Sequence, residues 1–168
     1  MADYSQFTAD AAALLGPKGW TSEAEAMSPW LTDWRGRYSG AAIGLGSQSS
    51  TEEVSALVNL CAAHNIAIVP QGGNSGMSGG ATPDDTGNAI VLSLRRMNTF
   101  REFDGENRSV TCDAGVILQT LHERAAQDRL RFPLTLGGKG SATIGGLIST
   151  NAGGTQVLRH GTMRAQVL

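Results

Sequence analysis

The pattern of apolar and polar positions is clearest over residues 50–69. Four apolar side chains recur with the i, i+3, i+4, i+7 spacing of one helix face: Val54, Leu57, Val58 and Cys61. Ser50 and Glu53 form a capping-box pair just before them. The spacing predicts an amphipathic helix that ends near Asn65. The apolar run at 66–69 follows directly and predicts a buried strand.

The same reasoning predicts the other elements of the chain. Helices are expected over 5–15, 21–27 and 115–127, and strands over 41–46, 89–94, 101–104 and 108–113. An apolar patch at Ile144, Leu147 and Ile148 predicts one buried helical turn or two. Helices alternating with strands indicate an α/β or α+β fold, and the meander-like strands within 89–113 argue against a purely parallel sheet.

Composition narrows the class of protein. At 168 residues, with 40% hydrophobic and 17% charged side chains, the chain suits one globular domain with its own core. A net charge of -2 without a basic block does not support a nucleic-acid-binding surface. No apolar run is long enough to span a membrane, and the N-terminus lacks a signal-peptide pattern. We therefore expect a soluble, cytoplasmic protein.

Cys61 and Cys112 are expected to be buried reduced thiols, with a disulfide as the alternative.

Glycine is the unusual residue, at 22 of 168 positions. Residues 70–80, PQGGNSGMSGG, place five glycines in eleven positions directly after the expected strand. Loop glycines cost conformational entropy on folding, so a dense cluster indicates that the backbone itself must approach something. Because Pro83, Asp84 and Asp85 predict a turn and not a long helix, we expect this loop to wrap an anionic ligand with successive backbone N–H groups. A flexible surface linker is the alternative.

A second glycine-rich segment, LGGKGSATIGGLISTNAGG, spans 136–154. Small residues let a flat group lie against the backbone, while hydroxyl and amide side chains orient its polar edge. The segment alone is also compatible with a tightly packed turn–helix corner. Two such clusters in one domain favour a shared ligand.

Two other glycine patterns do not fit nucleotide-binding motifs. The run from Gly44 to Ser49 has serine in place of the third glycine of a dinucleotide-binding fingerprint, and no acidic residue closes the next strand. The run Gly138-Lys139-Gly140 lacks the serine or threonine that follows lysine in a phosphate-binding P-loop. Arg95 and Arg96 are expected in a solvated turn, and the tryptophans at 20, 30 and 34 as packing residues.

The two glycine-rich segments together resemble the FAD-binding domain of the vanillyl-alcohol oxidase superfamily, the FAD-linked oxidases of PCMH type. The run DWRGRYSG and the segment 50–74 fit the same family, so the resemblance covers about residues 30–168. Within the superfamily, the chain is most similar to the D-2-hydroxyglutarate, D-lactate and glycolate dehydrogenase branch. The resemblance implies an α+β fold of two α/β subdomains, the second of them truncated.

The resemblance also implies a set of FAD-binding residues. In this family the first loop binds the FAD pyrophosphate through backbone amides, and the second segment contacts the diphosphate and the flavin. The implied positions in the first loop are Pro70, Gln71, Gly72, Gly73, Asn74, Ser75, Gly76 and Met77. Those in the second segment are Leu136, Lys139, Gly140, Ser141, Ile144, Gly145, Gly146, Thr150, Asn151, Ala152 and Gly153. Because Asn74 stands where some relatives carry a flavin-linked histidine, non-covalent FAD is expected.

The implied activity is oxidation of a D-2-hydroxy acid to the 2-oxo acid, with hydride transfer to flavin N5. Two alternatives are open: another FAD enzyme of the same fold, such as an alkylglycerone-phosphate-synthase-like or carbohydrate-oxidising enzyme, or a non-enzymatic nucleotide-binding module. The catalytic base and any metal ligands belong to a later substrate domain in this branch, so no catalytic or metal residue is assigned. The electron acceptor is left open.

The expected domain organisation is a helical segment and connector over 1–40 and an incomplete FAD-binding domain over 41–168. Residues 166–168 read as the start of a strand, so the chain is expected to stop within a longer protein. We therefore expect the chain alone to be catalytically inactive.

Overall fold

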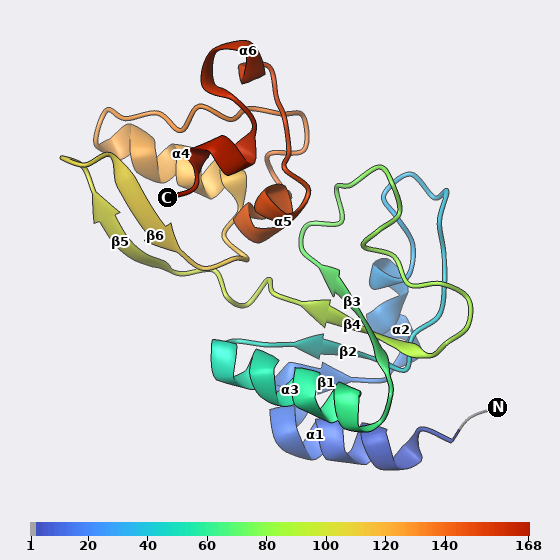
Figure 1. Cartoon of the computed structure of the whole chain (residues 1–168). Coiled ribbons are helices and arrows are strands. Elements are labelled where there is room, and N and C mark those ends of the chain that lie inside the picture. The colour runs from blue at the N-terminus through green and yellow to red at the C-terminus, as the bar shows by residue number, and fades with distance from the viewer. Residues whose placement is uncertain (1–2) are drawn as a thin grey trace. The chain divides into compact units, whose positions relative to one another are not determined.

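The computed structural model describes residues 3–168 (Figure 1). The chain forms two compact units, which meet in sequence between residues 96 and 97. Each unit combines helices with strands and has a hydrophobic core of its own.

The first unit is built on a four-stranded sheet. Its helices are α1 (Ser5–Gly19), α2 (Ala24–Met27) and α3 (Thr51–Ala63), with a 3-10 turn, η1, at Ser28–Trp30. Its strands are β1 (Trp20–Thr21), β2 (Gly44–Ser47), β3 (Ala67–Gln71) and β4 (Ala89–Ser93). In the order β1-β2-β4-β3, strand β4 runs parallel to both β2 and β3, and β1 pairs antiparallel with β2.

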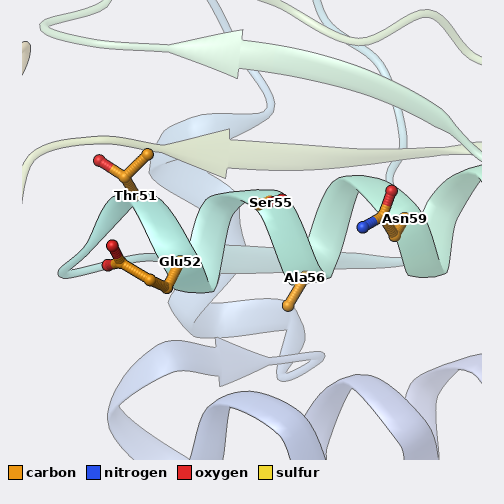
Figure 2. Close-up of a pocket in the computed structure, with 5 residues that line it drawn as sticks. All are labelled: Thr51, Glu52, Ser55, Ala56 and Asn59. Carbon is orange, nitrogen blue, oxygen red and sulfur yellow. The ribbon is translucent and has the colours of Figure 1, made fainter.

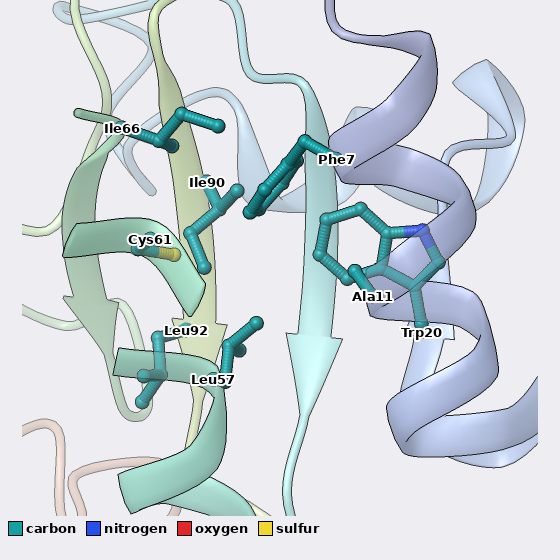
Figure 3. Packing of buried hydrophobic residues seen from close by; sticks show 8 residues of the cluster. All are labelled: Phe7, Ala11, Trp20, Leu57, Cys61, Ile66, Ile90 and Leu92. Atoms are coloured by element: carbon teal, nitrogen blue, oxygen red, sulfur yellow. The ribbon is translucent and has the colours of Figure 1, made fainter. Parts of the chain in front are cut away.

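The main core of this unit lies between α1, α3 and the sheet (Figure 3). Its buried members are Phe7, Ala11, Trp20, Leu57, Cys61, Ile66, Ile90 and Leu92. All five residues of β4 are buried, as expected for a central strand. Burial also raises the pKa of the Cys61 thiol to about 11. Both cysteines are free, as expected, although Cys112 is only half-buried.

The cap predicted at the start of α3 is confirmed, because the Ser50 hydroxyl accepts a hydrogen bond from the Glu53 amide at 3.2 Å. The helix predicted over 5–15 continues to Gly19 through a kink at Gly16, where φ is +65°. The helix predicted over 21–27 is wrong in its first turn, because Trp20 and Thr21 pair with β2 and the helix begins only at 24.

Strand β3 differs from its prediction in two ways. It continues through Pro70 and Gln71, which were expected in the loop. It also lies at the edge of its sheet, with Ala67 and Pro70 exposed, so the prediction of a buried strand was wrong. An edge position explains how a proline fits into the strand, because its missing N–H is not needed by a further neighbour.

The second unit contains a hairpin and a group of helices. Strands β5 (Phe100–Asp104) and β6 (Ser109–Cys112) pair antiparallel. The helices are α4 (Leu118–Gln127), α5 (Ile144–Ser149), α6 (Val157–His160) and a 3-10 turn, η2, at Met163–Gln166. Their core is formed by Val116, Leu118, Leu121, Leu134, Ala142, Ile144, Leu147 and Met163.

Two predictions for this unit need correction. Helix α4 begins three residues later than expected, because Ile117 is extended and forms a bridge with Thr143. At the C-terminal end, Gln166 belongs to η2, and Val167 has extended dihedral angles but joins no strand among residues 3–168. A strand needs a hydrogen-bonded neighbour, and extended angles alone do not provide one.

No helix in the described part of the chain is long and apolar enough to cross a bilayer.

Candidate cofactor site

The glycine loop, residues 72–80, leaves the end of β3 and belongs to the connection that leads into β4 (Figure 1). Gln71, the last residue of β3, ties this connection together. Its side-chain Nε2 donates to the carbonyl of Trp30 at 2.9 Å and to the carbonyl of Ala81 at 2.7 Å. Because the Gln71 side chain is buried, these two bonds hold the start of the loop close to its end. The Gln71 Oε1 atom is buried without a hydrogen-bond partner in the described residues.

The middle of the loop is held by residues outside it. Asn74 has φ +50°, a left-handed conformation that asparagine tolerates, and its Nδ2 donates to the Thr32 carbonyl at 2.8 Å. The indole N–H of Trp34 donates to the carbonyl of Gly76 at 3.1 Å, and Nε of Arg95 donates to the carbonyl of Gly72 at 3.0 Å. The loop is therefore fastened to the connector, residues 28–40, and to the turn after β4.

The backbone N–H groups of the loop differ from its carbonyls in their hydrogen bonding. Within residues 3–168, none of the amides of 73–78 donates a hydrogen bond to the protein. Gly76 is exposed, and a Cβ atom placed on it would meet no atom within 4 Å. The loop thus presents a run of N–H groups that have no acceptor in the described residues, and successive N–H groups of this kind can bind anionic oxygens. The linker alternative does not fit a loop fastened by this many side-chain bonds.

The connector has its own internal support. The Asp33 carboxylate accepts hydrogen bonds from the amides of Arg37 at 2.6 Å, Tyr38 at 2.8 Å and Arg35 at 3.3 Å. These donors hold the pKa of Asp33 below its ordinary value, with the Tyr38 amide contributing most. The Tyr38 ring in turn lies against Gly79, where an added Cβ would come within 2.8 Å of the ring. Glycine at 79, with φ +75°, is therefore required by both space and backbone conformation.

The second glycine-rich segment forms turns around α5 in the second unit. The side chain of Lys139 and the residues Gly140 and Ser141 are exposed, and the amide of Gly140 donates no bond among residues 3–168. Farther along, Ile144 is buried, and the amides of Ile144 and Gly145 already donate to the carbonyls of Val116 and Ala114, both at 2.8 Å.

The C-terminal side of α5 is also packed. The hydroxyl of Thr150 donates back to the Gly146 carbonyl at 2.9 Å. Asn151, with φ +51°, accepts from the Arg164 amide at 3.1 Å through its Oδ1. Ala152 is half-buried beside the core, and Gly153 is exposed. The turn–helix corner is therefore present in this segment, and only its exposed positions are open to solvent.

Two residues that hold the loop were missed by the sequence reasoning. Trp34 was expected to be a packing residue, but its side chain is exposed and donates to the loop. Arg95 lies in a turn, as expected, yet its guanidinium stacks 4.4 Å from the centre of the Trp30 ring and binds the loop. Each contact joins positions far apart in the sequence, so no local pattern could have indicated it.

A hollow in the first unit lies elsewhere, on the surface of α3 (Figure 2). It is lined by Thr51, Glu52, Ser55, Ala56 and Asn59, and none of these belongs to the glycine loop. Among residues 3–168, no three histidine, cysteine, aspartate or glutamate side chains are grouped so that they could hold a metal ion.

Comparison with known proteins gives a consistent result. Residues 47–168 match the family described as FAD binding domain. A probable mitochondrial D-2-hydroxyglutarate dehydrogenase from Oryza sativa subsp. indica is 39% identical over 155 residues, which are 92% of this chain and 27% of the rice protein. The chain therefore spans about a quarter of the length of that relative.

Two solved structures share the fold. Alkyldihydroxyacetonephosphate synthase has a TM-score of 0.84 at 22% identity, over 96% of this chain and 32% of that one. p-Cresol methylhydroxylase has a TM-score of 0.74 at 20% identity, over 89% of this chain and 30% of that one. At these identities the likeness is one of fold: the chain has the two-unit α+β architecture of PCMH-type domains.

Proposed function

Because the chain belongs to the FAD binding domain family, we propose that it is the FAD-binding part of an oxidoreductase that oxidises a D-2-hydroxy acid to the 2-oxo acid. The observation that carries the proposal is the state of the glycine loop. Its amides at 73–78 donate to no protein acceptor in the described residues, while the carbonyls of Gly72 and Gly76 are bound from outside. The identity to D-2-hydroxyglutarate dehydrogenases supports the substrate class.

The residues of the loop fit the FAD diphosphate. Its two phosphates carry negative charge, and a run of N–H groups with fixed direction binds such oxygens without a full positive charge. Gly73, Asn74, Ser75, Gly76 and Met77 would supply these amides, and Gly72, whose carbonyl is bound by Arg95, would lead into them. Pro70 has no N–H and Gln71 lies in β3, so their part would be to fix where the loop begins. Bound FAD supplies the two-electron redox chemistry, and the chain supplies binding and orientation.

Residues of the second unit are proposed to contact FAD as well. The exposed Lys139 ammonium and the Gly140 amide suit a phosphate oxygen, and Ser141 offers a hydroxyl. Ile144 and Gly145, whose amides are engaged, would contribute through packing, with Leu136, Gly146 and Ala152 beside them. Thr150, Asn151 and Gly153 are exposed and would contact the flavin. Asn74 carries an amide in place of a histidine, so we propose that the FAD is bound without a covalent link.

The position of the protein in the cell and its partners are also proposals. A small-molecule hydroxy acid would be the substrate, and its site would lie in residues outside this chain. A cytoplasmic location stays a prediction, because the rice relative is named as a mitochondrial protein. The domain boundary at residue 40 also stays a prediction, since α1 and β1 pack within the same unit as the residues up to 96.

The proposal predicts a bound flavin that a D-2-hydroxy acid reduces. The whole protein, purified without added cofactor, should show the visible absorption of a flavin that denaturation releases as free FAD. Under anaerobic conditions D-2-hydroxyglutarate, D-lactate or glycolate should bleach that absorption, and L-2-hydroxyglutarate serves as the matched control. A protein that neither carries nor takes up FAD contradicts the whole proposal. A flavin that none of these acids bleaches contradicts the substrate class alone.

A further inference from the structure

We propose that a small group of side chains acts as a brace that orients the glycine loop for FAD, with Trp34 and Arg95 as positioning residues. Here the brace means Trp34 and Arg95 together with Trp30 and Asp33, which hold them in place. The inference rests on the proposed function, because it assigns the brace to the same loop.

The hydrogen bonds from Trp34 and Arg95 reach carbonyl groups at the start and in the middle of the loop. Nε of Arg95 donates to the carbonyl of Gly72 at 3.0 Å, and the indole N–H of Trp34 donates to the carbonyl of Gly76 at 3.1 Å. In a planar trans peptide the C=O of one residue and the N–H of the next point in opposite directions. Drawing these two carbonyls toward the brace therefore turns the N–H groups of Gly73 and Met77 away from it.

Each donor of the brace is positioned by contacts that do not involve the loop. Arg95 stacks on the Trp30 ring, 4.4 Å from its centre. Such stacking fixes the plane of the guanidinium and so the direction of its Nε–H. Trp34 follows Asp33, whose buried carboxylate binds the amides of Arg37 and Tyr38 and closes the turn. A bridge between Thr32 and Ser39 closes the base of the same turn.

Trp34 has no evident packing role in the core of the first unit. Its side chain is 61% exposed, so it contributes little to the core. It also precedes residues 47–168, the part that matches the FAD binding domain family. A large, exposed aromatic residue whose N–H reaches a loop 42 positions away is therefore best explained by the loop it holds.

The brace predicts that its variants lose FAD affinity without losing the fold. In the whole protein, Trp34→Phe removes the indole N–H but keeps a ring, and Arg95→Met removes both the guanidinium stacking and the Nε donor. Each should raise the Kd for FAD about tenfold, the effect of losing one hydrogen bond that orders the site. The matched control is Arg37→Met, at an exposed arginine on the same turn whose side chain makes no hydrogen bond or ion pair in the described residues, since only its backbone amide binds Asp33. Its Kd should stay within twofold of the wild-type value.

Three further readouts separate positioning from a general loss of structure. The melting temperature of the FAD-free variants should match that of Arg37→Met. The absorption spectrum of the FAD that still binds should be unchanged, because the brace acts on the phosphate loop. Arg95→Lys should recover part of the affinity, since lysine can still reach the ring and donate.

The outcomes distinguish the brace from the proposed function. Wild-type protein that binds FAD while both variants bind it equally well overturns the brace alone. Variants that lose FAD affinity and also melt well below the control without FAD overturn it as well, because the residues would then have a general structural role. Wild-type protein that takes up no FAD overturns the proposed function and the brace together.

Discussion

Replacing Gln71 by glutamate is expected to destabilise the first unit by about 3–5 kcal/mol at pH 7, the usual cost of a buried charge without a partner. The Gln71 amide donates to the carbonyls of Trp30 and Ala81, and its side chain is buried. A carboxylate in this place would face two carbonyl oxygens and donate to neither. Urea denaturation of the Gln71→Glu variant measures the loss, and FAD affinity should fall with it because the loop is no longer closed.

The pH dependence identifies the cause of this loss. Burial among carbonyl oxygens raises the pKa of the new carboxyl in the folded chain above its unfolded value of about 4.3. The folded chain then holds the proton more tightly, so the variant is most stable below about pH 4.3 and loses stability as the pH rises toward the raised pKa. The control is Gln71→Met, which removes the same donor without a charge and should cost about 1–3 kcal/mol at every pH. A glutamate variant with the same pH profile as the methionine variant would contradict this account.

Replacing Gly76 by valine is expected to weaken FAD binding about a hundredfold while leaving the FAD-free fold intact. A Cβ atom on Gly76 meets no protein atom within 4 Å, so the fold itself does not require glycine there. The space beside the loop amides is the place that we assign to the diphosphate, and added methyl groups would fill it. Overpacking of this kind costs about 1–3 kcal/mol, and the upper part of that range converts to roughly a hundredfold in Kd.

The matched control is Gly105→Val, in the turn between β5 and β6. A Cβ atom on Gly105 likewise meets nothing within 4 Å. Both variants should unfold within about 1 kcal/mol of the wild-type protein, as surface substitutions do. Isothermal titration with FAD should then separate them. Equal FAD affinities for the two variants would mean that the loop does not approach the cofactor at Gly76.

Most of the fold could be predicted from local patterns. The spacing of apolar residues and the Ser50 cap gave α3, and the apolar run at 89–94 gave the central strand β4. The errors have a common physical origin, because they depend on partners distant in the sequence. Trp20 and Thr21 form a strand only because β2 lies beside them. The edge position of β3 follows from a strand order that the period of a single strand does not encode.

The candidate site likewise has features that the local sequence predicts and features that depend on distant contacts. The density of glycines after a strand predicted the loop, because a backbone that must approach a ligand closely requires glycine at several positions. The residues that fasten the loop could not be predicted from a local pattern of this kind. Trp34 and Arg95 reach it across 42 and 23 positions, and both act through donors that any tryptophan or arginine carries. In the second segment, the engaged amides of Ile144 and Gly145 could be found only from the packing of α5 against residues 114–116.

The central claim is that the amides of residues 73–78 bind the FAD diphosphate. Hydrogen–deuterium exchange of the whole protein, with and without FAD, tests it most directly, because these amides donate no bond to the protein among residues 3–168. We predict fast exchange of 73–78 without FAD and marked protection with it, while the turn at 105–108 does not change. Exchange at 73–78 that stays fast in FAD-saturated protein would contradict the account.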